Sequence, residues 1–372
     1  MKPLAGIRVV ELARILAGPW CGQLLADLGA EVIKIERPGA GDDTRHWGPP
    51  FLHDAAGENR DAAYFHACNR GKQSVAIDIA TPEGQARVRS LIAGADVVIE
   101  NYKVGGLVKY GLDAASLRAA DPRLVVCSIT GFGQTGPYAR RAGYDFIIQG
   151  MGGAMSLTGE PDGAPQKAGV AYVDLFTGVY SAVAILAALR RRDATGAGAH
   201  IDMALLDTQV GVLANQALNW MASGKVPHRM GNGHANLAPY QAFATQDGDL
   251  IIAVGNDGQF ARLCGVLGLT LHEDARFATN PGRVTNRAEL IPALAAAIAR
   301  WPKAALYEAL EAEGVPAGPI NRIDEVFADP QVRARGMQIV REGVPGLACP
   351  IVIDGERMVA DRPSPRRPAN DA

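Results

Sequence analysis

The chain has 372 residues, of which 48% are hydrophobic and 20% charged, and its formal net charge is -2. This is ordinary globular composition, and the near-neutral charge argues against a nucleic acid or a membrane surface as the main partner. Five scattered cysteines and seven dispersed histidines form no CxxC or HxxxH pattern, so we expect buried thiols in a reducing compartment and no metal site. The N-terminal apolar stretch is broken by Arg8 and Glu11, so no signal peptide is expected and the predicted location is cytoplasmic.

Residues 1–130 alternate short β-rich runs with helical patterns. Runs rich in Val and Ile that alternate with helices predict βαβ units and a parallel sheet. Ligands bind beyond the carboxyl ends of such strands, which here carry Arg14, Arg37, Asn101 and Gly131. The expected strands are IRVVEL (7–12), EVIKIERP (31–38), SVAIDI (74–79), DVVIEN (96–101) and RLVVCSIT (123–130).

Basic residues recur in the loops of this predicted sheet. Arg37 precedes a Gly-rich loop, NRGK ends in Lys72, and ENYKVGGLVKYG carries Lys103 and Lys109. Several separate cations in a chain of near-zero net charge favour a small polyanionic ligand, because Arg and Lys at strand ends suit phosphates. Solvated turns are the alternative interpretation.

The segment GFGQTG at 131–136 fits GxGxxG and follows a strand, so a dinucleotide-dependent oxidoreductase is one hypothesis. Pro137 follows at once, and no amphipathic helix or second acidic strand end comes after it. A tight Gly-rich loop that brings the backbone close to a neighbour is favoured instead. Tyr144 and Asp145 lie in the next loop and are candidate pocket residues.

Asp174 is the only charged residue between Lys167 and Arg190. An unpartnered carboxylate among apolar residues is costly, so a role must offset that cost. One interpretation is an N-cap of a helix over 175–192, and another is a nucleophile at the helix start, kept ionised by backbone N–H groups and the helix dipole. The apolar stretch 168–189 is long enough to suggest a membrane span, but Asp174 favours a buried core helix.

The second half of the chain predicts a smaller α+β domain. A hairpin is expected around Asp247-Gly248, followed by helical patterns. Gly231 and Gly233 form a Gly-rich loop that could cover a site or serve as a linker. The predicted domains are 1–195 (large α/β), 196–225 (helical connector), 226–322 (small α+β), and 323–372 (return to the large domain with a mobile tail).

Several long segments, in order, resemble the class III (CaiB/BaiF-type) CoA-transferases from about residue 4 to about residue 360. They include GIRVVELARILAGPWCGQLLADLGAEVIKIERPGAGDDTRHWGPPF, VVIENYKVGGL, SITGFGQTGPYARRAGYDFIIQGMGGAMSLTG and AGVAYVDLFTGVYSAVAILAAL. The runs at 29–51 and 254–264 look most like the branch that moves CoA from succinyl-CoA to dicarboxylates such as glutarate or citramalate.

The resemblance implies a Rossmann-like large domain, a smaller α+β domain and an interlocked-ring homodimer. It implies that Asp174, with Gly178 one turn on, attacks the donor thioester and passes through an aspartyl anhydride and an aspartyl-CoA thioester. CoA and acyl-CoA are then substrates, with no permanently bound cofactor. Implied catalytic-site residues are Asp174, Gly231, Gly233, Tyr144 and Asp145, with the glycines offering backbone N–H groups. Implied CoA-binding residues are Arg14, Ile15, Ala17, Arg37, Lys72, Asn101, Tyr102 and Lys109.

The same fold also hosts α-methylacyl-CoA racemases, which are the alternative. They carry a His where this chain has Tyr144, and a phenol is a poor match for α-proton abstraction. Asp257 lies near the position of a racemase Glu, which keeps that alternative open. Partners for the acceptor's second carboxylate are left unranked among Arg45, Arg140, Arg141 and His234.

Overall fold

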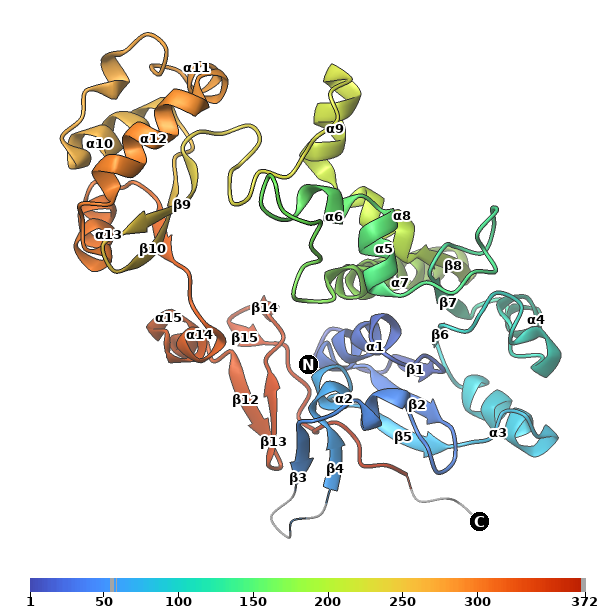
Figure 1. Ribbon diagram of the computed structural model, residues 1–372. Helices are drawn as coiled ribbons and strands as arrows, with labels where there is room; N and C mark the ends of the chain where they lie inside the picture. The colour runs from blue at the N-terminus through green and yellow to red at the C-terminus, as the bar shows by residue number, and fades with distance from the viewer. Residues whose placement is uncertain (54–56, 58, 369–372) are drawn as a thin grey trace. The chain divides into compact units, whose positions relative to one another are not determined.

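The computed structural model describes residues 1–53, 57 and 59–368, and the chain divides into two compact units (Figure 1). Each unit has its own hydrophobic core. Unit 1 comprises Met1–Gly153, Ala168–Leu213 and Asp329–Ala372, and unit 2 comprises Ala154–Lys167 and Ala214–Ala328.

A six-stranded sheet forms the centre of unit 1, and every strand pairs parallel to its neighbours. The expected α/β fold with a parallel sheet is therefore confirmed. The chain fills the sheet outward from β1 to one edge and then from β6 to the other, so the order reverses between β1 and β6. From edge to edge the strands are β5 (Gln73–Ala76), β2 (Glu31–Glu36), β1 (Arg8–Glu11), β6 (Val97–Glu100), β7 (Val125–Thr130) and β8 (Ala199–Ala204).

Helices cover both faces of this sheet (Figure 1). Val9, Ile99 and Val125 alternate along their strands with residues of opposite orientation, so each strand contributes apolar side chains to two cores. One core lies against α1 (Ala17–Asp27) and α7 (Tyr172–Thr195), and the other against α3 (Pro82–Ile92) and α4 (Ala114–Ala120). Shorter helices of unit 1 are α2 (Ala63–Ala67), α5 (Asp145–Met151), α8 (Leu205–Gly211) and α15 (Pro330–Ala334), with 3-10 turns η1 (Asp43–His46) and η2 (Val108–Tyr110).

Helix α7 packs against α1 through a glycine. A Cβ on Gly178 would lie 2.7 Å from the Ala17 carbonyl oxygen and 3.0 Å from the Trp20 ring, so only Gly permits this approach. By length and composition α7 is apolar enough to cross a membrane, a property that core helices share. Its buried face, which includes Val173 and Ile185, belongs to the core of unit 1.

The chain departs from the sequence-based expectation in the segment predicted as a helical connector. Residues Ala199–Ala204 form β8, the sixth strand, because alternating side chains such as Ala199 and His200 suit an edge strand with one buried face. The helices that follow are α8 and, in unit 2, α9 (Ala214–Ser223). The short insert Ala154–Lys167 also belongs to unit 2.

Part of the expected mobile tail is packed on unit 1. Ser364 is 2% exposed and hydrogen-bonds to His66, and Arg367 pairs with Asp61 at 2.8 Å. These contacts do not support the expectation of mobility as far as Arg367, and residues 369–372 lie outside the described part. Short antiparallel pairs complete this unit: β3 (Phe51–His53) with β4 (Asn59–Ala62), β12 (Gln338–Arg341) with β13 (Val344–Leu347), and β14 (Val352–Ile353) with β15 (Glu356–Arg357).

Unit 2 combines a small antiparallel sheet with helices around a separate apolar core. The expected hairpin is confirmed, since Thr245 pairs with Gly248 where β9 (Tyr240–Thr245) turns into β10 (Gly248–Ala253). The remaining elements are α6 (Ala154–Leu157), α10 (Asp257–Leu267), η3 (Leu271–Glu273), α11 (Asn280–Thr285), α12 (Arg287–Ile298), α13 (Lys303–Ala312), β11 (Ala317–Pro319) and α14 (Ile323–Ala328).

Candidate active site

The loop after β1 is tied to the end of β6 at the point where the strand order reverses. Asn101 accepts a hydrogen bond from the Arg14 backbone N–H at 3.0 Å and donates one to the Arg14 carbonyl at 2.6 Å. Open parallel sheets bind ligands at the carboxyl ends of the strands where the strand order reverses, as it does between β1 and β6. The two hydrogen bonds therefore fix one wall of a natural binding crevice.

Ile15 has φ +73°, a left-handed backbone that is strained for a β-branched residue. The Asp42 carboxylate accepts from the Ile15 N–H at 3.3 Å and from the Thr44 N–H at 3.0 Å. Lys34 holds Asp42 in place at 2.9 Å and also donates to the Ala13 carbonyl at 2.7 Å. A buried charge network thus stabilises the unusual shape of this loop.

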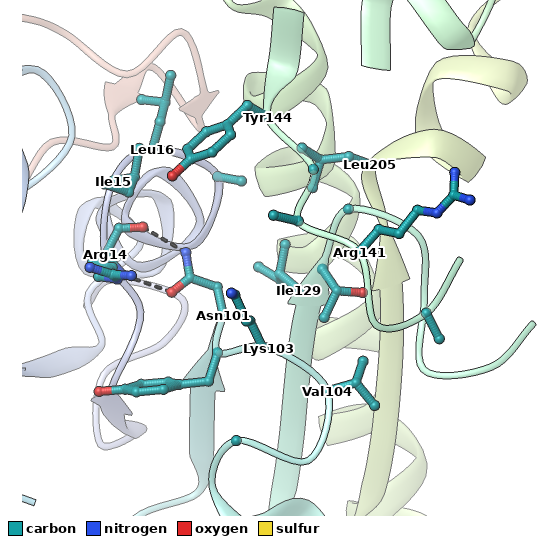
Figure 2. A pocket seen from close by; sticks show the side chains of 18 of the residues that line it. Arg14, Ile15, Leu16, Asn101, Lys103, Val104, Ile129, Arg141, Tyr144 and Leu205 are labelled. Carbon is teal, nitrogen blue, oxygen red and sulfur yellow. Dashed lines mark hydrogen bonds between the residues drawn. The ribbon is translucent and has the colours of Figure 1, made fainter. Parts of the chain in front are cut away.

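A cavity of about 440 Å³ opens between the β1 loop, the loop after β6 and the loop that precedes α5 (Figure 2). Arg14 and Asn101 lie on one side, and Tyr144 extends from the other side toward the loop of Ile15 and Leu16 (Figure 2). Of the predicted site residues, the cavity gathers Arg14, Ile15, Ala17, Asn101, Tyr102, Lys109 and Tyr144.

Arg37 lines a neighbouring hollow of about 190 Å³, which it shares with Arg14 and Tyr102. Both arginines face the same carboxylate: Asp43 lies 2.5 Å from Arg14 and 3.0 Å from Arg37. Two cations against one carboxylate leave this rim positive. The two hollows together suit a long ligand with several negative charges.

Lys72 is not among the residues that line either hollow, so the structure does not support its predicted role in CoA binding. Its side chain is fully buried and bonds to Glu11 at 2.8 Å, the Pro19 carbonyl at 2.8 Å and Asn69 at 2.9 Å. An ammonium group has three donors, and all three are used. Lys72 neutralises Glu11 inside the fold.

Asp174 is not the N-cap of its helix, contrary to the sequence-based expectation. Helix α7 begins at Tyr172, so Asp174 is its third residue, and its side chain makes no capping hydrogen bond. The Asp145 carboxylate takes that role from α5: it accepts from the Val173 N–H at 2.9 Å and the Asp174 N–H at 3.4 Å. A carboxylate distant in sequence therefore stabilises the helix start.

The sequence-based expectation that backbone N–H groups keep Asp174 ionised is also not met. Burial raises the pKa of Asp174 to about 7, and the nearby charge of Asp145 adds to the rise. Within the described part of the chain, no hydrogen bond or ion pair reaches its side chain. By contrast, buried Glu36 is paired with Arg45 at 2.6 Å and buried Asp27 with Arg70 at 2.7 Å.

Asp174 is not among the described residues that line the cavity, but its helix is contacted by one lining residue, Ala17, and by Asp145, the neighbour of a second. Tyr144 precedes Asp145, which binds the first turn of α7, and the Ala17 carbonyl contacts Gly178 one turn further on. The segments that form the cavity walls are therefore in direct contact with the helix that carries Asp174.

The Gly-rich loop at 131–136 has a packing role. A Cβ on Gly131 would lie 2.6 Å from the Cα of Gly143, so the loop after β7 lies directly against the loop that leads into Tyr144 and Asp145. No helix follows until α5 begins at Asp145. The expected close backbone approach is confirmed, and the geometry for a dinucleotide pyrophosphate is missing.

Gly231 and Gly233 belong to unit 2, and their role at the site stays a prediction. The proposed use of their N–H groups is not supported, because Gly231 donates to the Gly159 carbonyl at 3.0 Å and Gly233 to the Met230 carbonyl at 2.9 Å. Gly231 has φ +56°, which explains the need for glycine there.

Some cavity residues were not predicted as site residues. Lys103 lines it, and so does Leu205 at the start of α8, together with Arg141, which was one of the unranked candidates for the acceptor's second carboxylate. The sequence did indicate a position for Lys103 near the site, because it follows Asn101 and Tyr102 after β6. Leu205 could not be identified from the sequence, because the strand β8 that directly precedes it was taken for a helix. In the described part of the chain, no group of three His, Cys, Asp or Glu side chains could hold a metal ion.

The fold and this cavity define an α/β enzyme site for a polyanionic ligand. Residues 4–370 match the family described as CoA-transferase family III. A succinate–glutarate CoA-transferase from Agrobacterium fabrum is 57% identical over 370 residues, covering 98% of this chain and 92% of the relative. The succinyl-CoA:glutarate CoA-transferase of Mus musculus is 46% identical over 338 residues, covering 91% and 76%.

A crystal structure of a CaiB/BaiF family protein from Brucella suis is 60% identical, with a TM-score of 0.88, and covers 100% of this chain and 97% of that one. The chain belongs to CoA-transferase family III, and the predicted family and enzyme class are confirmed. It is an enzyme that moves CoA between carboxylic acids.

Proposed function

We propose that this enzyme transfers CoA from succinyl-CoA to a dicarboxylic acid acceptor, with glutarate as the first candidate. Two relatives similar over most of the chain carry succinate or succinyl-CoA and glutarate in their names. The cationic rim of Arg14, Arg37 and Lys109 supports the binding of the CoA phosphates at the sheet edge of unit 1.

The chemistry starts at the Asp174 carboxylate. An Asp174 oxygen attacks the succinyl thioester carbonyl, the CoA thiolate leaves, and a mixed anhydride remains. The thiolate then attacks the aspartyl carbonyl, which releases succinate and leaves an aspartyl-CoA thioester. The acceptor carboxylate attacks that thioester to give a second anhydride and free thiolate. The thiolate attacks the acceptor's carbonyl, which yields the new acyl-CoA and regenerates Asp174.

One observation carries this proposal: Asp174 is a partly buried carboxylate that the described residues leave without a hydrogen bond or ion pair. Burial raises its pKa to about 7, so much of it is ionised at neutral pH, yet poorly solvated. A desolvated carboxylate is a better nucleophile than one held by Arg or Lys. By comparison, the structural carboxylates Glu36 and Asp27 are each neutralised by a salt bridge, with Arg45 and Arg70 respectively.

Racemisation is the weaker candidate. Tyr144 replaces the expected His, and Asp257 is bonded at 2.7 Å to Arg283, whose side chain is fully buried. This ion pair gives Asp257 a structural partner within unit 2. Both positions therefore favour transfer over α-proton exchange.

We also propose that the enzyme is a homodimer, as the family resemblance implies. Helix α7 exposes Phe176, Val179, Tyr180 and Val183, and α5 exposes further apolar residues. Contiguous apolar side chains of this kind usually mark a protein interface. Light scattering after size exclusion tests this: a monomer at micromolar concentration would contradict it.

The test of the function is a transfer assay with succinyl-CoA and a panel of mono- and dicarboxylates, followed by mass spectrometry of the CoA products. We expect glutaryl-CoA and succinate from the wild type and neither from Asp174→Ala. An α-deuterated acyl-CoA run in parallel separates the alternative, since loss of deuterium without transfer would establish an isomerase.

A further inference from the structure

A buried glutamine joins two backbone segments beside Asp174. Gln149 on α5 is 1% exposed. Its side-chain nitrogen donates to Asp145 Oδ1 at 2.6 Å, one helical turn back, and its side-chain oxygen accepts from the Ala168 N–H at 2.9 Å. Both ends of the amide are used, so Gln149 is fixed in one orientation.

The second oxygen of Asp145 continues this chain of hydrogen bonds. Oδ2 accepts from the N–H groups of Val173 and Asp174. The segment from Ala168 to Asp174 is therefore held at its start by Gln149 and at its end by Asp145, while Gln149 holds Asp145. The orientation of one carboxylate decides where the first turn of α7 begins.

We propose that Gln149 is a positioning residue for CoA transfer, which locks the Asp145 carboxylate and the Ala168 backbone so that the first turn of α7 presents Asp174 in one geometry. This rests on the proposed role of Asp174 as nucleophile. Gln149 is not among the described residues that line the cavity, so it acts through Asp145 and not on CoA itself.

The titratable groups around Asp174 come from two elements. Asp145 of α5 adds its charge to the effect of burial on the pKa of Asp174. The second titratable group is Tyr64 of α2. Burial and then the charge of Asp174 raise the pKa of its phenol to about 12, which shows that the two side chains are close. Helix α1 contributes the Ala17 carbonyl and Trp20 at Gly178. Of these groups, only Asp145 is held by Gln149.

The fold offers a matched control in Gln209 of α8. It is also 1% exposed, and its side-chain oxygen accepts from the Tyr172 hydroxyl at 2.6 Å, at the first residue of the same helix. Gln209→Met therefore removes a buried amide that supports α7 without touching Asp145. Gln149→Met removes an amide of equal size that does bind Asp145.

The experiment measures steady-state transfer from succinyl-CoA to glutarate in both variants, with circular dichroism melts to check folding. We expect Gln149→Met to lower kcat at least about tenfold, since displacement of a reacting group by about 1 Å can cost a hundredfold. Its KM for succinyl-CoA should stay within about twofold of wild type, and kcat of Gln209→Met within about threefold. Equal kcat values for the two folded variants would overturn the proposal.

Gln149→Glu keeps the size and the acceptor for Ala168 and gives a second readout that also serves if the Met variant fails to fold. Two carboxyl groups at hydrogen-bond distance share one proton, and the shared proton replaces the amide N–H. We expect activity of this variant to rise with pH as Asp174 ionises, as in wild type, and then to fall again at higher pH as the shared proton leaves. A pH profile identical to wild type would contradict a role for the Gln149 N–H.

Trapping of the covalent intermediate separates failure of this inference from failure of the proposed function. Wild type and Gln149→Met are mixed with succinyl-CoA, quenched and digested. The inference predicts an adduct on Asp174 in both, formed more slowly in the variant. An equal rate would reject only the role of Gln149, whereas absence of an adduct from wild-type Asp174 would reject the function.

Discussion

The Asp145 carboxylate accepts a 3.4 Å hydrogen bond from the backbone N–H of Asp174 and at the same time places a negative charge beside the Asp174 side chain. The two effects act on different properties. The hydrogen bond helps to fix where α7 begins, whereas the charge, added to burial, raises the pKa of Asp174 to about 7. A single residue thus links the geometry of the proposed nucleophile to its protonation.

The raised pKa predicts the acid limb of the activity profile. Only ionised Asp174 can attack the thioester, so kcat/KM should rise with pH through about 7 and then level off. Asp145→Asn removes the neighbouring charge and should move this limb to lower pH. Initial rates at saturating glutarate check both profiles, and an unmoved limb in the variant would show that burial alone sets the pKa.

Asp174→Asn should make the protein more stable at neutral pH. The folded-state pKa of about 7 exceeds the ordinary Asp pKa of 3.8, so the folded protein holds a proton that the unfolded chain loses. Wild-type stability therefore falls between about pH 4 and pH 7, by at most about 4 kcal/mol, while the Asn variant escapes that loss. Urea unfolding at pH 4 and pH 8 checks this, and a gap that does not widen with pH would contradict it.

Gly178→Ala should separate α7 from α1. The new Cβ would meet the backbone carbonyl of Ala17 at 2.7 Å, which cannot swing away as a side chain can. Overpacking of this kind costs about 1 to 3 kcal/mol, and we expect loss of transfer because Asp174 lies one turn away.

Gly211→Ala is the matched control, since nothing lies within 4 Å of its Cβ position at the end of α8. Any gain in helix propensity is common to both variants. Denaturant midpoints and transfer rates that fall equally in the two would show that the contact with Ala17 is unimportant.

Arg14 and Lys72 should behave differently although both are basic residues of the same sheet. Arg14→Gln is exposed at the cavity, so it should raise the KM for succinyl-CoA with little change in the unfolding free energy. Lys72→Met leaves Glu11 with one cation fewer in the core and should cost about 3 to 5 kcal/mol. Melting curves and saturation kinetics separate the two outcomes.

The sequence predicted the binding edge of the sheet well, because strand ends in a parallel sheet converge. Arg14, Asn101 and Lys109 follow recognisable Val- and Ile-rich strands, and all three reach one cavity. Lys72 looked equivalent, yet it is buried against Glu11, since a sequence does not show which cations have an internal partner.

The environment of Asp174 could not be predicted for a related reason. An Asp before an apolar run is a common helix cap, but here Asp145, twenty-nine residues earlier, supplies the cap through tertiary contact. Because Asp145 of α5 supplies the cap, the Asp174 side chain does not have to bind the N–H groups at the start of α7. The strand β8 was missed because its six alternating residues lie between a long helix and further helical patterns and were taken for part of a helical connector.

The most direct test of the account is to map the covalent intermediate. The enzyme is incubated with succinyl-CoA without acceptor, treated with hydroxylamine or borohydride, digested and sequenced by mass spectrometry. We expect a hydroxamate or reduced side chain on Asp174 in the wild type and none in Asp174→Asn. Modification at another carboxylate, or full transfer activity in Asp174→Asn, would contradict it.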